Sequence, residues 1–117
     1  MSYKRVERIG DQIRVEISDI IARRLNDPRV GFVTVTAVEV SEDLRHAKVF
    51  VSVFGDDSTK EETMKGLKSA AGFIKGEVGH RITLKFTPDL HFRLDESLDK
   101  AEHVLSILNE LEKEEHK

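Results

Sequence analysis

Two runs rich in β-branched residues, separated by a short turn, constrain the fold of this chain more than any other feature. Residues 32–40 and 47–54 alternate valine or alanine with polar or aromatic side chains, the pattern of strands with one buried face. The mostly polar connection 41–46 is too short for a crossover, so the two strands are predicted to pair antiparallel. In the first run the alternation changes phase near Ala37, which indicates a β-bulge or burial on both faces.

Hydrophobic periodicity predicts helices on both sides of this pair. Isoleucines at three- and four-residue steps favour a helix over residues 4–25, which ends before Pro28 because the residue preceding a proline avoids the α region. After the second strand, residues 55–59 form a loop in which Ser58 or Thr59 is expected to cap the next helix.

That central helix is predicted to run to Ala70 and to be followed, after a kink, by a shorter helix that reaches Val78 and is ended by Gly79. A third strand is expected over residues 82–87 and 90–93, with Pro88 inside it. Because proline cannot donate to a ladder, this strand should lie at an edge or contain a bulge.

A last helix is predicted to start near Ser97, with an apolar face made by Leu98, Ala101, Val104, Leu105, Leu108 and Leu111. The order α-β-β-α-kink-α-β-α then predicts a single α+β domain over residues 1–110, with a frayed charged tail over residues 111–117. The two helices between the second and third strands allow those strands to lie parallel, which makes a three-stranded mixed sheet packed under helices.

Composition excludes several classes of protein. The 117 residues contain no cysteine, so disulfides and thiolate metal sites are absent, and no apolar run approaches the ~20 residues that cross a bilayer. The basic N-terminus is not followed by an apolar region, and we expect a cytoplasmic protein without a signal peptide.

No pattern of residues supports catalysis, a metal site or a cofactor. The histidines lie far apart in sequence, the serines lack a nucleophile elbow, and no Gly-Lys-Ser phosphate-binding motif occurs. Acidic pairs such as Asp56-Asp57 fall in turns, where carboxylates commonly cap helices. An enzyme is therefore the weakest of the functional hypotheses.

Charge is unevenly distributed along a chain whose net charge is −3. Residues 1–31 and 61–87 each carry a net charge of +2, whereas residues 88–117 carry −5. This asymmetry is compatible with one basic, RNA-binding face, and equally with ordinary scatter. An alternative of another class is a protein-interaction module that docks a basic partner through its acidic C-terminal helix.

Specific motifs resemble the bacterial ribosome-binding factor A family, whose fold is a type II K-homology (KH)-like domain. The resemblance covers roughly residues 1–110 and is carried by residues 68–75, by residues 83–97, by the N-terminal helix and by the first two strands. The Pro-x-Leu-x-Phe-x-x-Asp run at residues 88–95 is its most specific part.

The resemblance implies a non-enzymatic assembly factor without cofactors. It implies binding to the free small (30S) ribosomal subunit and its 16S rRNA, help in late maturation of the rRNA 5′ end, and a role in cold adaptation. A monomer is expected, with a functional link to an assembly GTPase.

Members of this family carry an Ala-x-Gly kink between the two central helices, where ordinary KH domains have a Gly-x-x-Gly loop. Here the motif falls on Ala70-Ala71-Gly72. A glycine permits an unusual backbone turn and close approach of a phosphate, and the start of the next helix presents amides and a positive dipole end. The alternative is that Gly72 merely ends a helix.

A literal Gly-x-x-Gly occurs at residues 76–79 and is interpreted as a decoy. As a clamp it would leave too few residues for a second helix and would place Glu77 against phosphate. The first helix adds cations outside its apolar stripe, either as a solvated face or as a second RNA contact. The predicted RNA-binding residues are Lys4, Arg5, Arg8, Lys68, Ala70, Ala71, Gly72, Lys75, Arg81 and Lys85.

Aromatic residues are few and mostly fall in predicted strands, where a place in the core is the usual outcome. These are Phe32, Phe50, Phe54, Phe86 and Phe92. RNA contact is therefore expected to involve backbone and shape rather than base stacking on a sheet.

Overall fold

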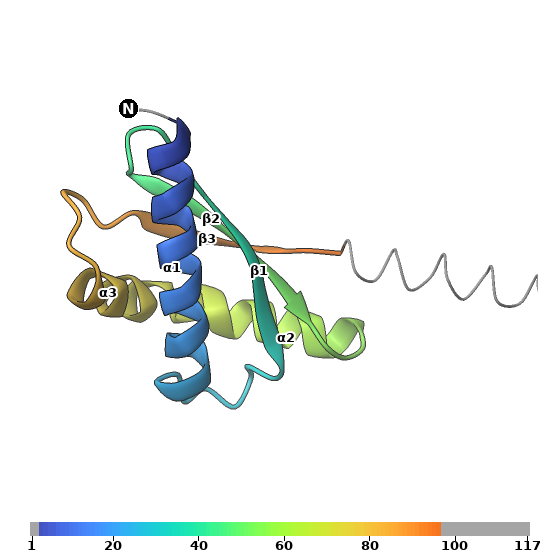
Figure 1. Cartoon of the computed structure of the whole chain (residues 1–117). Helices are drawn as coiled ribbons and strands as arrows, with labels where there is room; N and C mark the ends of the chain where they lie inside the picture. The colour runs from blue at the N-terminus through green and yellow to red at the C-terminus, as the bar shows by residue number, and fades with distance from the viewer. Residues whose placement is uncertain (1–2, 97–117) are drawn as a thin grey trace, which may run out of the picture.

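The computed structural model describes residues 3–96, which contain six of the seven predicted elements (Figure 1). In chain order they are α1 (Tyr3–Arg23), β1 (Val33–Val40), β2 (His46–Val53), α2 (Asp57–Ser69), α3 (Ala71–Arg81) and β3 (Asp89–Leu94). The helix predicted from Ser97 and the tail over residues 111–117 lie outside the described residues. Among those described, no helix is long and apolar enough to span a membrane.

The three strands form one mixed sheet in the order β1-β2-β3. β1 pairs antiparallel with β2, and β2 pairs parallel with β3, as the sequence predicted. The register of the first pair shifts between Val35 and Ala37, which confirms the bulge. Beyond this shift Val38 and Val40 lie opposite the buried Val49 and Ala47, so the extra residue returns the valines of β1 to the core face.

The core lies between one face of the sheet and the three helices. α1 contributes to this core the apolar stripe that the isoleucine spacing predicted. The sheet contributes the alternate residues of β2 together with Phe92 of β3. α2 and α3 contribute Leu67, Ile74 and Val78, each fully buried. Since helices and inward side chains share one cluster, all three described helices cover the same face of the sheet.

Two predictions about helix ends were wrong. Asp56, not Ser58 or Thr59, caps α2, because its carboxylate accepts from the Thr59 amide at 2.8 Å. Gly79 does not end α3, which continues to Arg81. Instead, a Cβ at Gly79 would lie 3.0 Å from the Thr87 hydroxyl, so the glycine gives room for the loop that follows.

The third strand begins later than predicted. Residues 82–88 are not in a strand, and β3 starts at Asp89, immediately after the buried Pro88. The proline lacks the amide that a ladder needs, and β3 pairs only with β2 among the described strands, so the expected edge position is confirmed.

The prediction that the phenylalanines form the core was also wrong, except at one position. Phe92 is 2% exposed, whereas Phe32 and Phe54 are each 82% exposed. Phe50 is half-buried, and Phe86 lies exposed in the loop before β3. A period-2 pattern does not say which face is covered, and these aromatic side chains fall outside the core face.

Candidate nucleic-acid interface

The junction between the two central helices is a single residue, Ala70. Its backbone torsions are φ −88° and ψ 0°, and its amide donates to the carbonyls of Gly66 and Leu67 at 3.0 and 3.1 Å. α3 begins at the next residue, without a side-chain cap. The predicted kink is therefore present, made by an alanine in an ordinary right-handed conformation.

Gly72 has a different role from the one expected. It is the second residue of α3, so it neither ends a helix nor adopts a positive φ. It is exposed, and a Cβ there would meet no atom within 4 Å. The open space permits close approach from solvent at the positive end of the helix dipole, although the backbone itself does not require glycine.

Two lysines flank this junction, and only one of them has an ion-pair partner among residues 3–96. Lys68 is exposed near the end of α2 and makes no ion pair with any residue between 3 and 96. Lys75, on α3, lies 2.6 Å from the Asp89 carboxylate, and this hydrogen bond lowers the pKa of Asp89. A phosphate at Lys75 must therefore compete with a carboxylate, whereas one at Lys68 need not.

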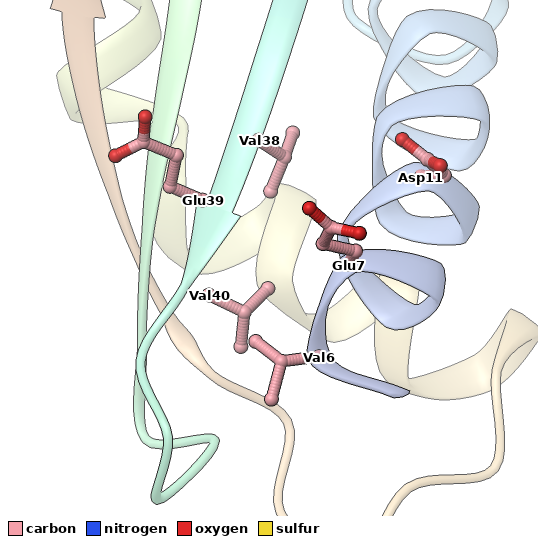
Figure 2. Close-up of a pocket in the computed structure, with 6 residues that line it drawn as sticks. All are labelled: Val6, Glu7, Asp11, Val38, Glu39 and Val40. Atoms are coloured by element: carbon pink, nitrogen blue, oxygen red, sulfur yellow. The ribbon is translucent and has the colours of Figure 1, made fainter. Parts of the chain in front are cut away.

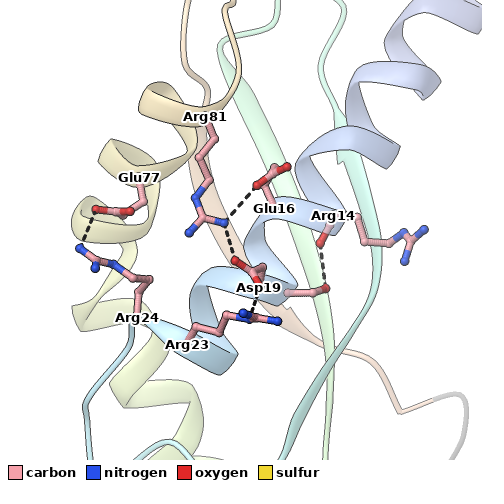
Figure 3. A network of polar contacts seen from close by, with 8 residues as sticks. Arg14, Glu16, Asp19, Arg23, Arg24, Glu77 and Arg81 are labelled. Atoms are coloured by element: carbon pink, nitrogen blue, oxygen red, sulfur yellow. Dashed lines mark hydrogen bonds and ion pairs between the residues drawn. The ribbon is translucent and has the colours of Figure 1, made fainter.

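The predicted contact Arg81 is part of an ion-pair network between α3 and α1 (Figure 3). Its guanidinium lies 2.7 Å from Asp19 and 3.1 Å from Glu16, and a second pair joins Arg24 to Glu77 at 3.7 Å. Hydrogen bonding with the two carboxylates raises the pKa of Arg81, and the same contact lowers the pKa of Asp19. Arg81 thus lies at the opposite end of α3 from the junction and ties two helices together.

A second group of cations comes from the start of α1, the turn between β1 and β2, and the loop that enters β3, three segments that lie toward the same end of the domain (Figure 1). The Arg45 guanidinium stacks 4.7 Å from the centre of the Phe86 ring, and the Lys85 ammonium lies 5.6 Å from it. The Arg45 carbonyl also accepts from the Asp89 amide at 2.8 Å. We call this group, with the exposed Lys4, Arg5 and Arg8 of α1, the basic end.

Sequence reasoning missed Arg45 and the exposed Phe73. Arg45 lies in a turn beside Asp43, and its aromatic partner is far away in sequence, so no local signal identifies it. Phe73 is 45% exposed in the first turn of α3, beside the junction. The sequence does contain a weak signal for Phe73, because it follows directly on the Ala-Ala-Gly motif.

An acidic groove of about 700 Å³ lies between the start of α1 and the end of β1 and borders the basic end (Figure 2). Its floor is formed by Val6, Val38 and Val40, and its walls carry Glu7 and Asp11 from α1. These carboxylates disfavour phosphate at the groove. Between residues 3 and 96 no three acidic or histidine side chains are arranged to hold a metal ion.

Comparisons with known proteins agree with this architecture. The family model described as "Ribosome-binding factor A" matches residues 5–108. A ribosome-binding factor A of Halothermothrix orenii is 48% identical over 115 residues, which cover 98% of this chain and 94% of that protein.

Solved structures give the same result. The crystal structure of ribosome-binding factor A from Thermus thermophilus superposes with a TM-score of 0.68 at 25% identity, over 76% of this chain and 94% of that chain. A homology model of the T. thermophilus factor, fitted into a cryo-EM map of a 30S–RbfA complex, has a TM-score of 0.66 at 24% identity, over 78% and 96% of the two chains. Its likeness to this chain concerns the fold. Sequence and structure together place the chain in the ribosome-binding factor A family.

Proposed function

We propose that this chain binds the free small (30S) ribosomal subunit and contacts its 16S rRNA during assembly. The observation that carries the proposal is family membership across residues 5–108. Support comes from the T. thermophilus relative, which was fitted into the map of a 30S complex. We further propose that the factor assists late maturation of the rRNA 5′ end, matters for growth in the cold, and acts as a cytoplasmic monomer without enzymatic activity. Its link to an assembly GTPase belongs to the same proposal.

Two groups of cations would carry the RNA contact. One is the α2–α3 junction, where Lys68 and the open backbone at Gly72 face solvent. The other is the basic end with Arg45 and Lys85. Arginine and lysine contacts to phosphate supply affinity with little dependence on sequence.

Exposed aromatic residues beside both groups modify the expected mode of binding. Phe73 lies beside the junction, and Phe86 lies under the cations of the basic end. Stacking of unpaired bases on such rings adds to phosphate contacts in single-stranded RNA. We therefore propose a mixed contact, with phosphates bound by cations and one or two bases stacked on phenylalanine.

Sedimentation tests the proposal directly. The protein should be recovered with free small subunits and only weakly with whole ribosomes. Lys68→Ala should reduce this recovery, and Lys65→Ala should not, because Lys65 on the same helix already pairs with Glu61 and Glu62 at 3.6 and 3.5 Å. Equal recovery with both particles, or with neither, would contradict the assignment.

Charge reversal at Glu110 and Glu114 separates this proposal from a protein-interaction module. An acidic C-terminal surface that docks a basic partner would bind more weakly after reversal and would be insensitive to Lys68→Ala. RNA binding predicts the opposite pattern, because removing negative charge reduces long-range repulsion from RNA.

A further inference from the structure

The sheet face that the described helices leave open carries mainly charged side chains at one end and, apart from the Asp95 carboxylate at its border, uncharged side chains at the other. Where β2 and β3 begin, it presents Glu39, His46, Lys48, Asp89, His91 and Arg93. Where β1 begins and β2 ends, the alternation and the register place six uncharged residues on it: Phe32, Thr34, Ala37, Phe50, Ser52 and Phe54. We call these six residues the aromatic patch.

Two phenylalanines dominate the aromatic patch. The Phe54 amide donates to the Phe32 carbonyl at 3.1 Å, so the two residues lie directly opposite each other across the strands. Each phenylalanine is 82% exposed. This exposure is unusual, because such a side chain carries roughly 150–250 Å² of mostly apolar surface. Exposed apolar surface of this extent marks an interaction site.

The chain leaves the sheet next to this patch. β3 runs parallel to β2, and the Asp95 amide donates to the Val51 carbonyl at 2.7 Å. The Asp95 carboxylate accepts from the Thr36 hydroxyl of β1 at 2.7 Å, so its side chain crosses β2 on the open face. Asp95, one residue before the end of the described chain, therefore lies beside the aromatic patch.

The sequence of the segment after residue 96 complements the patch. Apolar residues recur at the spacing of one helix face, and residues 97–111 as a helix would extend about 22 Å. We propose that residues 97–111 dock as an amphipathic helix on the aromatic patch and cover Phe32 and Phe54. The covered sheet then has helices on both faces.

The same chain is a better occupant of the patch than RNA or a second copy. The patch contains no cation, and phosphate binding depends on cations. A tethered helix acts at an effective concentration of roughly millimolar, which a separate partner rarely reaches. Residues on the opposite helix side, such as Asp99 and Glu110, would remain in solvent.

Disulfide trapping in the full chain tests the docking, because the natural sequence contains no cysteine. Ser52→Cys combined with Ala101→Cys places one thiol in the patch and one on the apolar helix face. The control combines Ser52→Cys with His103→Cys, which has nearly the same tether but lies on the other side of a helix. At low protein concentration the first pair should form an intramolecular disulfide in clear excess over the control, and Leu105→Asp should abolish the excess.

Labelling of the single variant Ser52→Cys gives a second readout that needs no trapping. Its thiol should react slowly with a soluble reagent, and faster when Leu105→Asp is added, while circular dichroism shows that the domain remains folded. Equal disulfide yields in the two pairs would overturn the proposal. So would disulfide-linked dimers at every concentration, which indicate a second copy, or protection of the thiol that requires added RNA.

Discussion

The Lys75 ammonium lies 2.6 Å from the Asp89 carboxylate and joins α3 to the first residue of β3. The sequence motif gives Lys75 and Lys68 equal status as flanking cations. The structure separates them, because only Lys75 has an anionic partner among residues 3–96. The two lysines should therefore contribute unequally to RNA binding.

Lys68→Ala is expected to weaken RNA binding and to lower the salt slope by roughly 0.7 to 0.9, the effect of removing one lysine–phosphate interaction. Lys75→Ala should have a smaller effect on the slope, since part of its charge is neutralised by Asp89. Asp89→Asn should raise the affinity, because it releases Lys75. RNA affinity measured at two or more salt concentrations gives all three results.

Lys65→Ala is the control for these variants, since it removes one cation from the same helix without touching the junction. Equal decreases in affinity for Lys65, Lys68 and Lys75 variants would show that only net charge matters. Wild-type affinity and slope in both flanking variants would remove the α2–α3 junction from the RNA-binding site.

Gly72→Ala separates the backbone role of this glycine from its role in access. The residue lies in α3 with nothing within 4 Å of a Cβ, so alanine should leave the free energy of unfolding unchanged or raise it by up to about 1 kcal/mol. If phosphate approaches the backbone here, RNA affinity should fall despite the gain in stability. Denaturant unfolding and RNA titration of one preparation give both values.

Gly76→Ala is the matched control, in the same helix and equally open. It should gain stability and keep its RNA affinity, since the Gly-x-x-Gly at residues 76–79 lies within a continuous helix. A decrease in affinity at Gly76 with none at Gly72 would move the RNA-binding position along α3.

The sequence predicted the helices and strands well where one face of the element is buried and its hydrophobic residues recur periodically. The isoleucine stripe of α1, the alternation in β2 and the phase change at Ala37 each report burial directly, and each is present in the structure. Pro28 and Pro88 also indicated boundaries through their local chemistry, as a helix end and an edge strand. Each of these signals comes from residues that are close together in sequence, so a single sequence is enough to detect it.

The remaining features depend on contacts between distant segments. Gly79 looks like a helix stop, but its neighbour is Thr87 across a loop. The pairing of Arg81 with Glu16 and Asp19 spans most of the domain, and the stacking of Arg45 on Phe86 joins two loops. Helix and strand propensities depend on neighbouring residues in the sequence and carry no information about such pairs. Which of the predicted cations have an ion-pair partner could therefore be learned only from the folded structure.

Gly10→Ala should destabilise the protein by about 1–3 kcal/mol, the usual cost of overpacking. A Cβ at Gly10 would lie 2.7 Å from the Val38 carbonyl oxygen, so α1 could no longer approach β1 as closely. The obstacle is backbone, which cannot rotate away as a side chain does. Denaturant unfolding measures the change, and Gly76→Ala, with open space around it, should alter stability in the opposite direction.

The ion pairs of Arg81 should make stability depend on pH in the acid range. Asp19 has its pKa lowered from an ordinary value of 3.8, first through its hydrogen bond with Arg81. A carboxyl with a lowered folded pKa stabilises the fold fully above its unfolded pKa, and this contribution disappears as the pH falls through the folded value. We therefore expect stability to decrease as the pH falls below about 4.

Asp19→Asn tests this expectation by removing the group that titrates. The variant should be less stable than the natural protein at neutral pH. The difference should begin to shrink below about pH 4 and should disappear as the pH falls through the lowered pKa of Asp19, where the natural carboxylate becomes protonated as well. Glu61→Gln is the control. The Glu61 carboxylate is 70% exposed and lies 3.6 Å from the Lys65 ammonium, and exposed ion pairs of this kind contribute little to stability. Denaturant unfolding at several pH values measures both variants. If the stability difference of Asp19→Asn is the same at neutral and at acid pH, the contact with Arg81 contributes through packing rather than charge, and the network does not explain acid sensitivity.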